Sequence, residues 1–203
     1  PYTITYESLL AAANEFDPEG QAITFIVSRM SSGTISKDGV PFVANQTRLG
    51  PGESLTWTPT AKSSGNTRAF QIFANDGIQN SARAIQVTIP VNAAPTVTSV
   101  RELILPAGVT SVEIDYATMA NLANDSDRNK DLISFRIDSV ISGTLLLNGE
   151  QVIPGLSLLT PGSILTYTPL EGATGKFAAF TIRAFDGRLT SLVAPTVSLR
   201  IGR

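Results

Sequence analysis

Carboxylates are concentrated in one short stretch, residues 124–131, which reads NDSDRNKD. Asp125, Asp127, Asn129 and Asp131 stand at every second position, as do the first ligands of a calcium loop, whose oxygen donors converge at about 2.3–2.6 Å from the ion. The stretch departs from an EF-hand, because a lysine replaces the turn glycine and Arg136 replaces the bidentate glutamate. A calcium ion held here therefore needs a ligand from a distant part of the chain.

Asp186 is the natural candidate for that distant ligand. It lies in an Asp-Gly pair, and a second pair, Asp76-Gly77, occurs 110 residues earlier. The acidic loop also has a weaker copy, NEFDPEGQ, at residues 14–21. Both features have an alternative explanation without metal, because Asp and Asn stabilise turns through hydrogen bonds to nearby backbone amides. A calcium site and a solvated turn both remain open at this point.

Several function classes are excluded or disfavoured by composition. The chain has no cysteine and no histidine, so thiol catalysis, Ser-His-Asp triads and the usual His or Cys zinc sites cannot be built within it. Its 15 basic residues are scattered among 17 acidic ones, which argues against nucleic acid as a partner. No apolar run reaches the roughly 20 residues of a membrane span. The chain begins with Pro1 and no charged-then-apolar leader, which suggests a processed protein or a fragment.

The two copies of the loop belong to a longer internal repeat. Residues 1–93 align without a gap on residues 111–203, a shift of 110, and a little under a third of the positions are identical. SSGTISKDG aligns with ISGTLLLNG, and LGPGESLTWTP aligns with LTPGSILTYTP. We therefore expect two domains of one kind, at residues 1–93 and 94–203.

Each copy has the pattern of β-structure. AITFIVSRM and LISFRIDSV alternate apolar and other residues with a period of two, as strands with one buried face do. Asp38-Gly39 and Asn148-Gly149 are typical of tight hairpin turns, which need positive φ angles. YESLLAAAN and YATMANLAN, before the acidic loops, predict one or two helical turns. Short strands with frequent turns predict an all-β chain made of two tandem antiparallel β-sandwiches.

The first copy is expected to lack its opening strand. Pro95 marks the linker, and residues 96–105 look like the opening strand of the second copy, with no counterpart in the first. We therefore expect that the chain was cut from a longer array or that a neighbouring chain fills the gap, since open sheet edges accept added strands.

The repeat resembles the Ig-like and cadherin-like tandem repeats of bacterial surface and secreted proteins, including chondroitin-sulfate-proteoglycan-type repeats. The resemblance is carried by the Tyr-to-Asp helical segment, the SGT strand with its Asp-Gly or Asn-Gly turn, the L-x-PG strand and the AF-x-I-x-A-x-DG strand. It implies calcium shared between the acidic loop and the Asp-Gly turn. The pairs implied are Asp127 with Asp186 in the second copy and Asp17 with Asp76 in the first. Together with the oxygen donors read from the loops themselves, the candidate ligands are Asp125, Asp127, Asn129, Asp131 and Asp186 in the second copy and, more weakly, Asp17, Glu19 and Asp76 in the first.

The resemblance also implies a non-enzymatic structural or adhesive module, secreted or on the cell surface. Its expected partners are further copies of the repeat, as a head-to-tail homopolymer or filament, and a surface protein or glycan. An alternative is a carbohydrate-binding accessory module that uses exposed aromatics such as Phe16, Phe177 and Phe185, although Trp57 and Tyr167 are expected in the core. A hydrolase using Asp125 or Asp127 with Asp186 is a third alternative.

Overall fold

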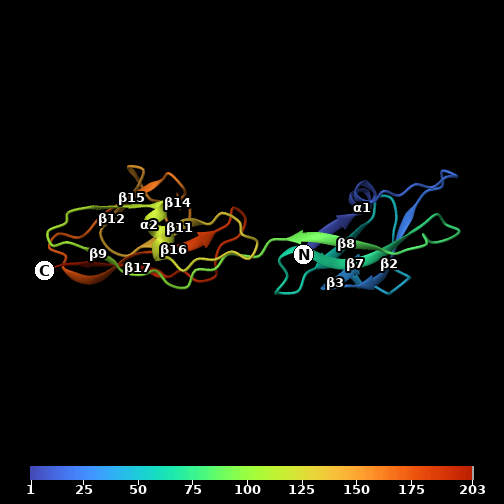
Figure 1. Ribbon diagram of the computed structural model, residues 1–203, viewed down its shortest axis with the longest axis horizontal. Helices are drawn as coiled ribbons and strands as arrows, with labels where there is room; N and C mark the ends of the chain where they lie inside the picture. Colours follow the sequence, from blue (N-terminus) through green and yellow to red (C-terminus); the bar gives the residue numbers. More distant parts are fainter. Residues whose placement is uncertain (203) are drawn as a thin grey trace. The chain divides into compact units, whose positions relative to one another are not determined.

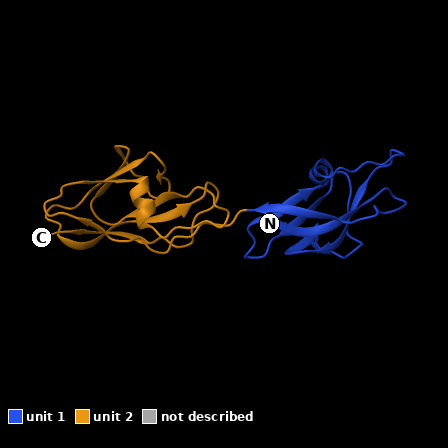
Figure 2. Ribbon diagram, in the orientation of Figure 1, with its two compact units in different colours: residues 1–91 blue, residues 92–203 orange. Residues whose placement is uncertain are grey.

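The computed structural model describes residues 1–202 and shows an all-β architecture in which strands dominate and two short helices interrupt them (Figure 1). The chain divides into two compact units, residues 1–91 and 92–203 (Figure 2), two residues before the boundary drawn from the sequence. The prediction of an all-β chain is confirmed. Among the described residues, neither helix has the length and apolar character that crossing a bilayer requires.

Unit 1, residues 1–91, holds eight strands in two sheets. One sheet has the order β1-β6-β3-β4 and the other has the order β5-β2-β7-β8. The elements are β1 (Tyr2–Thr5), α1 (Tyr6–Ala12), β2 (Thr24–Met30), β3 (Thr34–Lys37), β4 (Val40–Pro41), β5 (Arg48–Leu49), β6 (Ser54–Thr58), β7 (Gly65–Asn75) and β8 (Ile85–Val91).

Unit 2, residues 92–203, repeats this order and adds one strand. Its sheets have the orders β10-β15-β12-β13 and β14-β11-β16-β17-β9. The elements are β9 (Leu103–Leu105), β10 (Val112–Asp115), α2 (Tyr116–Leu122), β11 (Ser134–Val140), β12 (Thr144–Leu147), β13 (Glu150–Gln151), β14 (Leu158–Leu159), β15 (Ile164–Thr168), β16 (Gly175–Phe185) and β17 (Thr196–Ile201). The pairing registers also repeat at the same shift: Tyr2 pairs with Trp57 in unit 1, and Val112 pairs with Tyr167 in unit 2.

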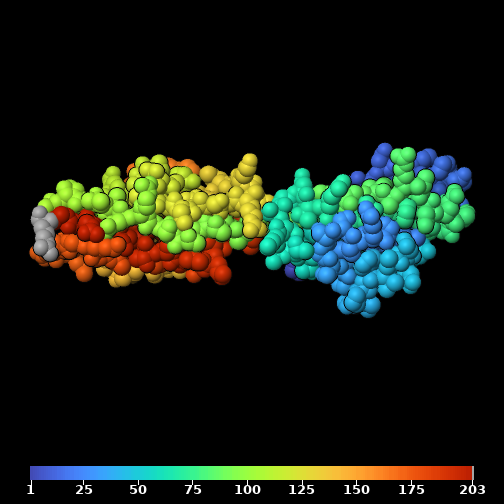
Figure 3. Space-filling view, turned by 60° about the horizontal axis from the view of Figure 1, so that its bottom comes forward, coloured from blue at the N-terminus to red at the C-terminus, as the bar shows by residue number. Residues whose placement is uncertain are grey.

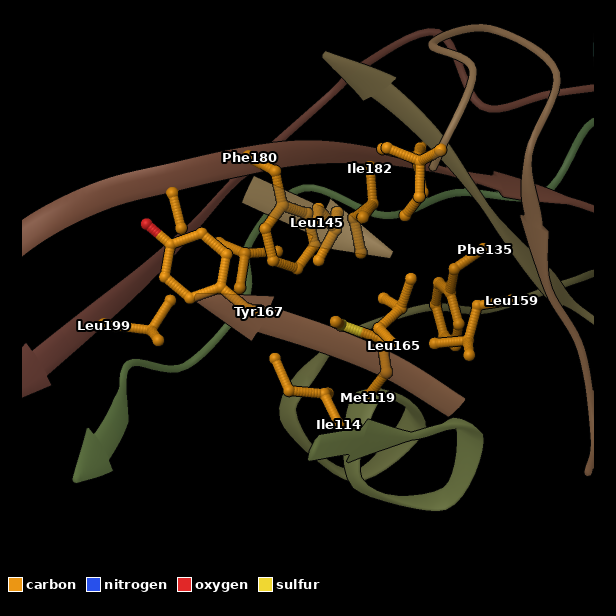
Figure 4. Close-up of a cluster of buried hydrophobic side chains, with 14 of the residues drawn as sticks. Ile114, Met119, Phe135, Leu145, Leu159, Leu165, Tyr167, Phe180, Ile182 and Leu199 are labelled. Atoms are coloured by element: carbon orange, nitrogen blue, oxygen red, sulfur yellow. The ribbon is translucent and has the colours of Figure 1, made fainter. Parts of the chain in front are cut away.

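One hydrophobic core lies between the two sheets of each unit. In unit 2, Phe135 and Ile182 of one sheet meet Leu145 and Leu165 of the other, with Tyr167 among them (Figure 4). Trp57 holds the equivalent place in unit 1, and both aromatic rings are fully buried, as predicted. Their polar atoms stay hydrogen-bonded: the Trp57 indole donates to the Ser32 carbonyl at 2.9 Å, and the Tyr167 and Ser142 hydroxyls lie 3.1 Å apart.

The predicted turns and helices have the expected local chemistry. Asp38 and Asn148 adopt φ values of 51° and 50° in the hairpins β3-β4 and β12-β13, each followed by a glycine of positive φ. The helices start at different capping residues, because Thr5 accepts from the Ser8 amide in α1 while Asp115 accepts from the Thr118 amide in α2. Both predictions are confirmed.

A tyrosine at the start of each helix fixes the loop that follows the helix. The Tyr6 hydroxyl donates to the Ile23 carbonyl, and the Tyr116 hydroxyl donates to the Ile133 carbonyl, both at 2.7 Å. Each bond joins residues 17 positions apart and thus ties the start of the helix to the residue that follows the acidic loop. The same hydrogen bond therefore fixes the loop in both units.

The opening strand of unit 2 differs from its prediction. Only Leu103–Leu105 forms a strand, β9, which pairs in parallel with β17. Before it, Thr96 and Val100 make isolated bridges to Ser126 and Ala123, so the chain first runs along the acidic loop. In Figure 3 the light-green surface of this segment lies beside the yellow surface that contains that loop. The prediction of one strand over residues 96–105 was therefore wrong in extent.

Candidate metal site of unit 2 and the corresponding groove of unit 1

The acidic loop of unit 2 is a tight turn organised by Asp127. Its Oδ1 atom accepts the backbone amides of Asn129 at 2.7 Å and Asp131 at 3.2 Å. Lys130 between them has a φ of 64°, a left-handed conformation that is uncommon for a residue other than glycine. The turn folds the loop back on itself and brings the carboxylates of Asp127 and Asp131 together.

Asp186 stands in the turn that follows β16. Its Oδ1 atom accepts the backbone amides of Arg188 at 2.7 Å and Leu189 at 2.6 Å, and its Oδ2 atom accepts the Asn92 side-chain amide at 2.9 Å. Partial burial acts to raise the pKa of Asp186, but these hydrogen bonds outweigh it, and the pKa lies below its ordinary value. Asp186 is therefore ionised near neutral pH.

Three carboxylates converge between the loop and this turn. Asp127, Asp131 and Asp186 each place one oxygen within 4.8 Å of the others. The Oδ2 atom of Asp127 is closed to solvent and has no hydrogen-bond partner within residues 1–202. Two like charges about 5 Å apart repel by roughly 3 kcal/mol at an effective dielectric constant of about 20. A hard cation would remove this repulsion and would give Asp127 Oδ2 the partner it lacks.

The other two predicted ligands of unit 2, Asp125 and Asn129, have different surroundings. Asp125 is outside the three-carboxylate group; burial raises its pKa, and its charge adds to burial in raising the pKa of Tyr116. The Asn129 side-chain oxygen accepts the Ala93 amide at 2.9 Å. Asn92 was missed in the sequence because it lies in the linker, outside both acidic stretches.

Unit 1 has the same turns without the same convergence. Asp17 Oδ1 accepts the amides of Glu19 and Gln21, and Asp76 Oδ1 accepts two amides of its own turn. Within residues 1–91 no three acidic side chains come as close together as those of unit 2. Asp17, Glu19 and Asp76 instead line an open groove of about 320 Å³.

The candidate aromatics for sugar binding differ in their exposure. Phe16 is 83% exposed and lines the groove of unit 1. Phe177 is half-buried and stacks on Tyr167 with ring centroids 6.4 Å apart, so its expected exposure was wrong. Phe185 is also half-buried, at the end of β16.

No family model matches the chain, and no curated protein matches it. Among solved structures, the endo-fucoidan hydrolase MfFcnA4 from glycoside hydrolase family 107 shares 16% identity at a TM-score of 0.34 and covers 91% of this chain. The endo-fucoidan hydrolase MfFcnA9 of the same family shares 18% identity at a TM-score of 0.28 and covers 92% of this chain. This chain spans 24% and 29% of those two chains.

The S-layer protein SbsC is a further protein of similar structure. Its domains 4 and 5 share 13% identity at a TM-score of 0.31, covering 87% of this chain and 100% of that one. These similarities place the chain in no family.

Proposed function

We propose that the chain is a non-enzymatic structural module of an extracellular repeat array, made of two Ig-like or cadherin-like β-sandwiches, with calcium bound in the second. The observation that carries the proposal is the duplication itself. Two units repeat the same order of strands, the same helix and the same pairing registers at a shift of 110 residues. A stack of similar units is the architecture of repeat arrays.

The residues shared by the two copies serve the fold. Gly33 and Gly143 allow close packing against the next strand, and Tyr6 and Tyr116 fasten each helix. The shared aspartates of the loops and Asp-Gly turns accept backbone amides within their own turns. The duplication retains packing and turn residues, which supports a structural role.

Calcium is the cation that best suits unit 2. All three convergent side chains are carboxylates, and calcium takes six to eight oxygen ligands in flexible geometry. The Oδ2 atom of Asp127 is buried without a partner, so a cation would satisfy it. The bound ion would join the loop after α2 to the turn after β16. Since Asn92 donates to Asp186, the bound ion would also stiffen the first residues of unit 2.

Calcium binding is tested by calorimetric titration and by melting with calcium or a chelator. At about 100 times Kd the ion adds about 2.7 kcal/mol to the free energy of unfolding, which for a unit of this size raises Tm by at least about 10 °C. Asp127→Asn should abolish the rise. Asp38→Asn, at an exposed hairpin turn, is the matched control and should leave it intact. An equal calcium-dependent rise in Tm in both variants would show that calcium does not bind at Asp127.

The array role has separate tests. Sedimentation at increasing protein concentration should show head-to-tail growth, and antibodies against the chain should label intact cells of the source organism. A monomer at all concentrations, together with labelling only after lysis, would contradict the proposal. Loss of the calcium effect alone would leave the array role standing.

A further inference from the structure

The opening segment of unit 2 is held along its whole length by residues that belong to the repeat. Its first contacts are made at the acidic turns, where Asn92 donates to Asp186 and the Ala93 amide donates to Asn129. Thr96 then exchanges two backbone hydrogen bonds with Ser126, at 2.8 and 2.9 Å.

Asn124 clamps the next part of the segment. Its side-chain oxygen accepts the amides of Thr98 and Ser99 at 2.9 and 2.8 Å, and its side-chain nitrogen donates to the Thr98 hydroxyl at 2.8 Å. The segment then enters the sheet as β9, with Leu103 opposite Leu199 and Leu105 opposite Ile201.

The segment also seals the core of unit 2. Val97 and Leu105 are members of the core, 1% and 9% exposed. On the neighbouring strand β17, Val197 and Leu199 are fully buried. An added strand that carries apolar side chains thus completes the hydrophobic interior at this edge.

Unit 1 has a matching sheet edge on which residues 1–91 place no further strand. β8 is the last strand of its sheet, and its inward-facing Val87 and Ile89 are only partly buried. The groove of about 320 Å³ lies between residues 15–19 and 74–81, the counterparts of the turns that hold Asn92 and Ala93. Asn14, the counterpart of Asn124, is exposed, and its side chain has no hydrogen bond within residues 1–202.

We infer that unit 1 binds an extended linker segment of the same pattern as residues 92–105, supplied by an adjoining repeat unit, which runs through this groove and pairs in parallel with β8. Applying the shift of 110 to the β9 register places the two leucines of the segment opposite Ile89 and Val91. Asn14 would accept two of its backbone amides. This inference rests on the proposed array, because the occupant is a linker between repeats.

Pro90 limits which strands can pair with the free edge of β8. In unit 2 the Gly202 amide donates to the Leu105 carbonyl, and since amides alternate sides along a strand, the Arg200 amide faces β9 as well. Pro90 stands at the position of Arg200 and has no amide hydrogen. A strand on β8 therefore forfeits one ladder hydrogen bond and depends more on its apolar side chains and on Asn14. Strands that lack such apolar side chains bind poorly, because proline at a sheet edge disfavours pairing with an added strand.

The experiment joins a second copy of residues 92–110 to the front of Pro1 in the full chain, reproducing the spacing found in unit 2. Trp57 is the one tryptophan of the chain and lies in the core of unit 1, so its fluorescence reports the unfolding of that unit. The Trp57 melting midpoint should rise by at least about 5 °C. In the control extension, serine replaces the residues copied from Val97 and Leu105, and the rise should be lost.

A second arm uses the unextended chain and a free peptide of residues 92–107. Saturable binding would show that an untethered segment is accepted, whereas stabilisation by the extension alone would show supply along one chain. Asn14→Ala should leave the Trp57 midpoint of the unextended chain unchanged and should reduce the gain from the extension.

No rise with the extension and no peptide binding, or an equal rise with the serine control, would overturn the inference. The proposed calcium site would be unaffected by that outcome, because its titration reports on unit 2.

Discussion

Replacing Gly33 by alanine is expected to destabilise unit 1 far more than the same replacement at Gly39. Both glycines have left-handed backbones, with φ of 70° and 78°. They differ in their surroundings. A Cβ atom on Gly33 would lie 2.3 Å from the Thr58 carbonyl oxygen and 2.9 Å from the Trp57 indole nitrogen, while a Cβ on Gly39 has nothing within 4 Å.

The expected magnitudes follow from these surroundings. The left-handed conformation costs alanine about 1 kcal/mol at either position. At Gly33 the Thr58 carbonyl must also move, although Thr58 pairs with Thr34 in the sheet and the neighbouring Trp57 ring is fully buried. Overpacking and a weakened hydrogen bond add roughly 2–4 kcal/mol. We therefore expect a loss of about 3–5 kcal/mol for Gly33→Ala and about 1 kcal/mol for Gly39→Ala.

Urea unfolding followed by Trp57 fluorescence measures both losses in unit 1, from the shift of the midpoint at constant slope. Gly143→Ala is the parallel case in unit 2, where the Cβ would lie 2.3 Å from the Thr168 carbonyl oxygen. Losses for Gly33→Ala and Gly39→Ala that agree within about 0.5 kcal/mol would refute the reasoning, because the shared backbone cost would then account for both.

Two further predictions concern unit 2. Asn124→Ala removes the acceptor of the Thr98 and Ser99 amides, so we expect about 1–2 kcal/mol lower stability by calorimetry and faster hydrogen exchange at those amides; unchanged exchange would contradict this role. Hydrogen bonds from Thr118 hold the pKa of Asp115, the α2 cap, below its ordinary value of 3.8. This stabilisation is present above that value and lost as the pH falls through the lowered pKa. Asp115→Thr, which copies the α1 cap, should weaken acid destabilisation of unit 2 below about pH 4, and an unchanged acid profile would count against it.

The sequence predicted the features that depend on neighbouring residues. The hairpins at Asp38-Gly39 and Asn148-Gly149 and the two short helices follow from local dihedral and capping preferences. The buried face of β11 follows from the alternation of apolar residues, whereas β2 buries Phe25, Ile26 and Val27 in succession and so departs from that alternation. The internal repeat added the equivalence of Trp57 and Tyr167, both of which are buried.

The features that were missed depend on contacts between distant segments. The stretch of residues 96–105 has a strand-like composition, but the isolated bridge at Thr96 and the clamp at Asn124 take its first half along the acidic loop. Asp125 alternates with the other acids in sequence, yet it lies outside their group. Asn92 reaches Asp186 across 94 residues, a distance over which no local pattern applies.

The parallel pairing of β9 with β17 has a mechanical consequence for unit 2. β9 is its first strand and β17 its last, and the two run in the same direction side by side. Tension on the two ends of the unit would pull these strands past each other along their length, so the ladder bonds would carry the load together rather than open one at a time. A polypeptide joined in this way resists stretching at the place where the force enters and leaves it.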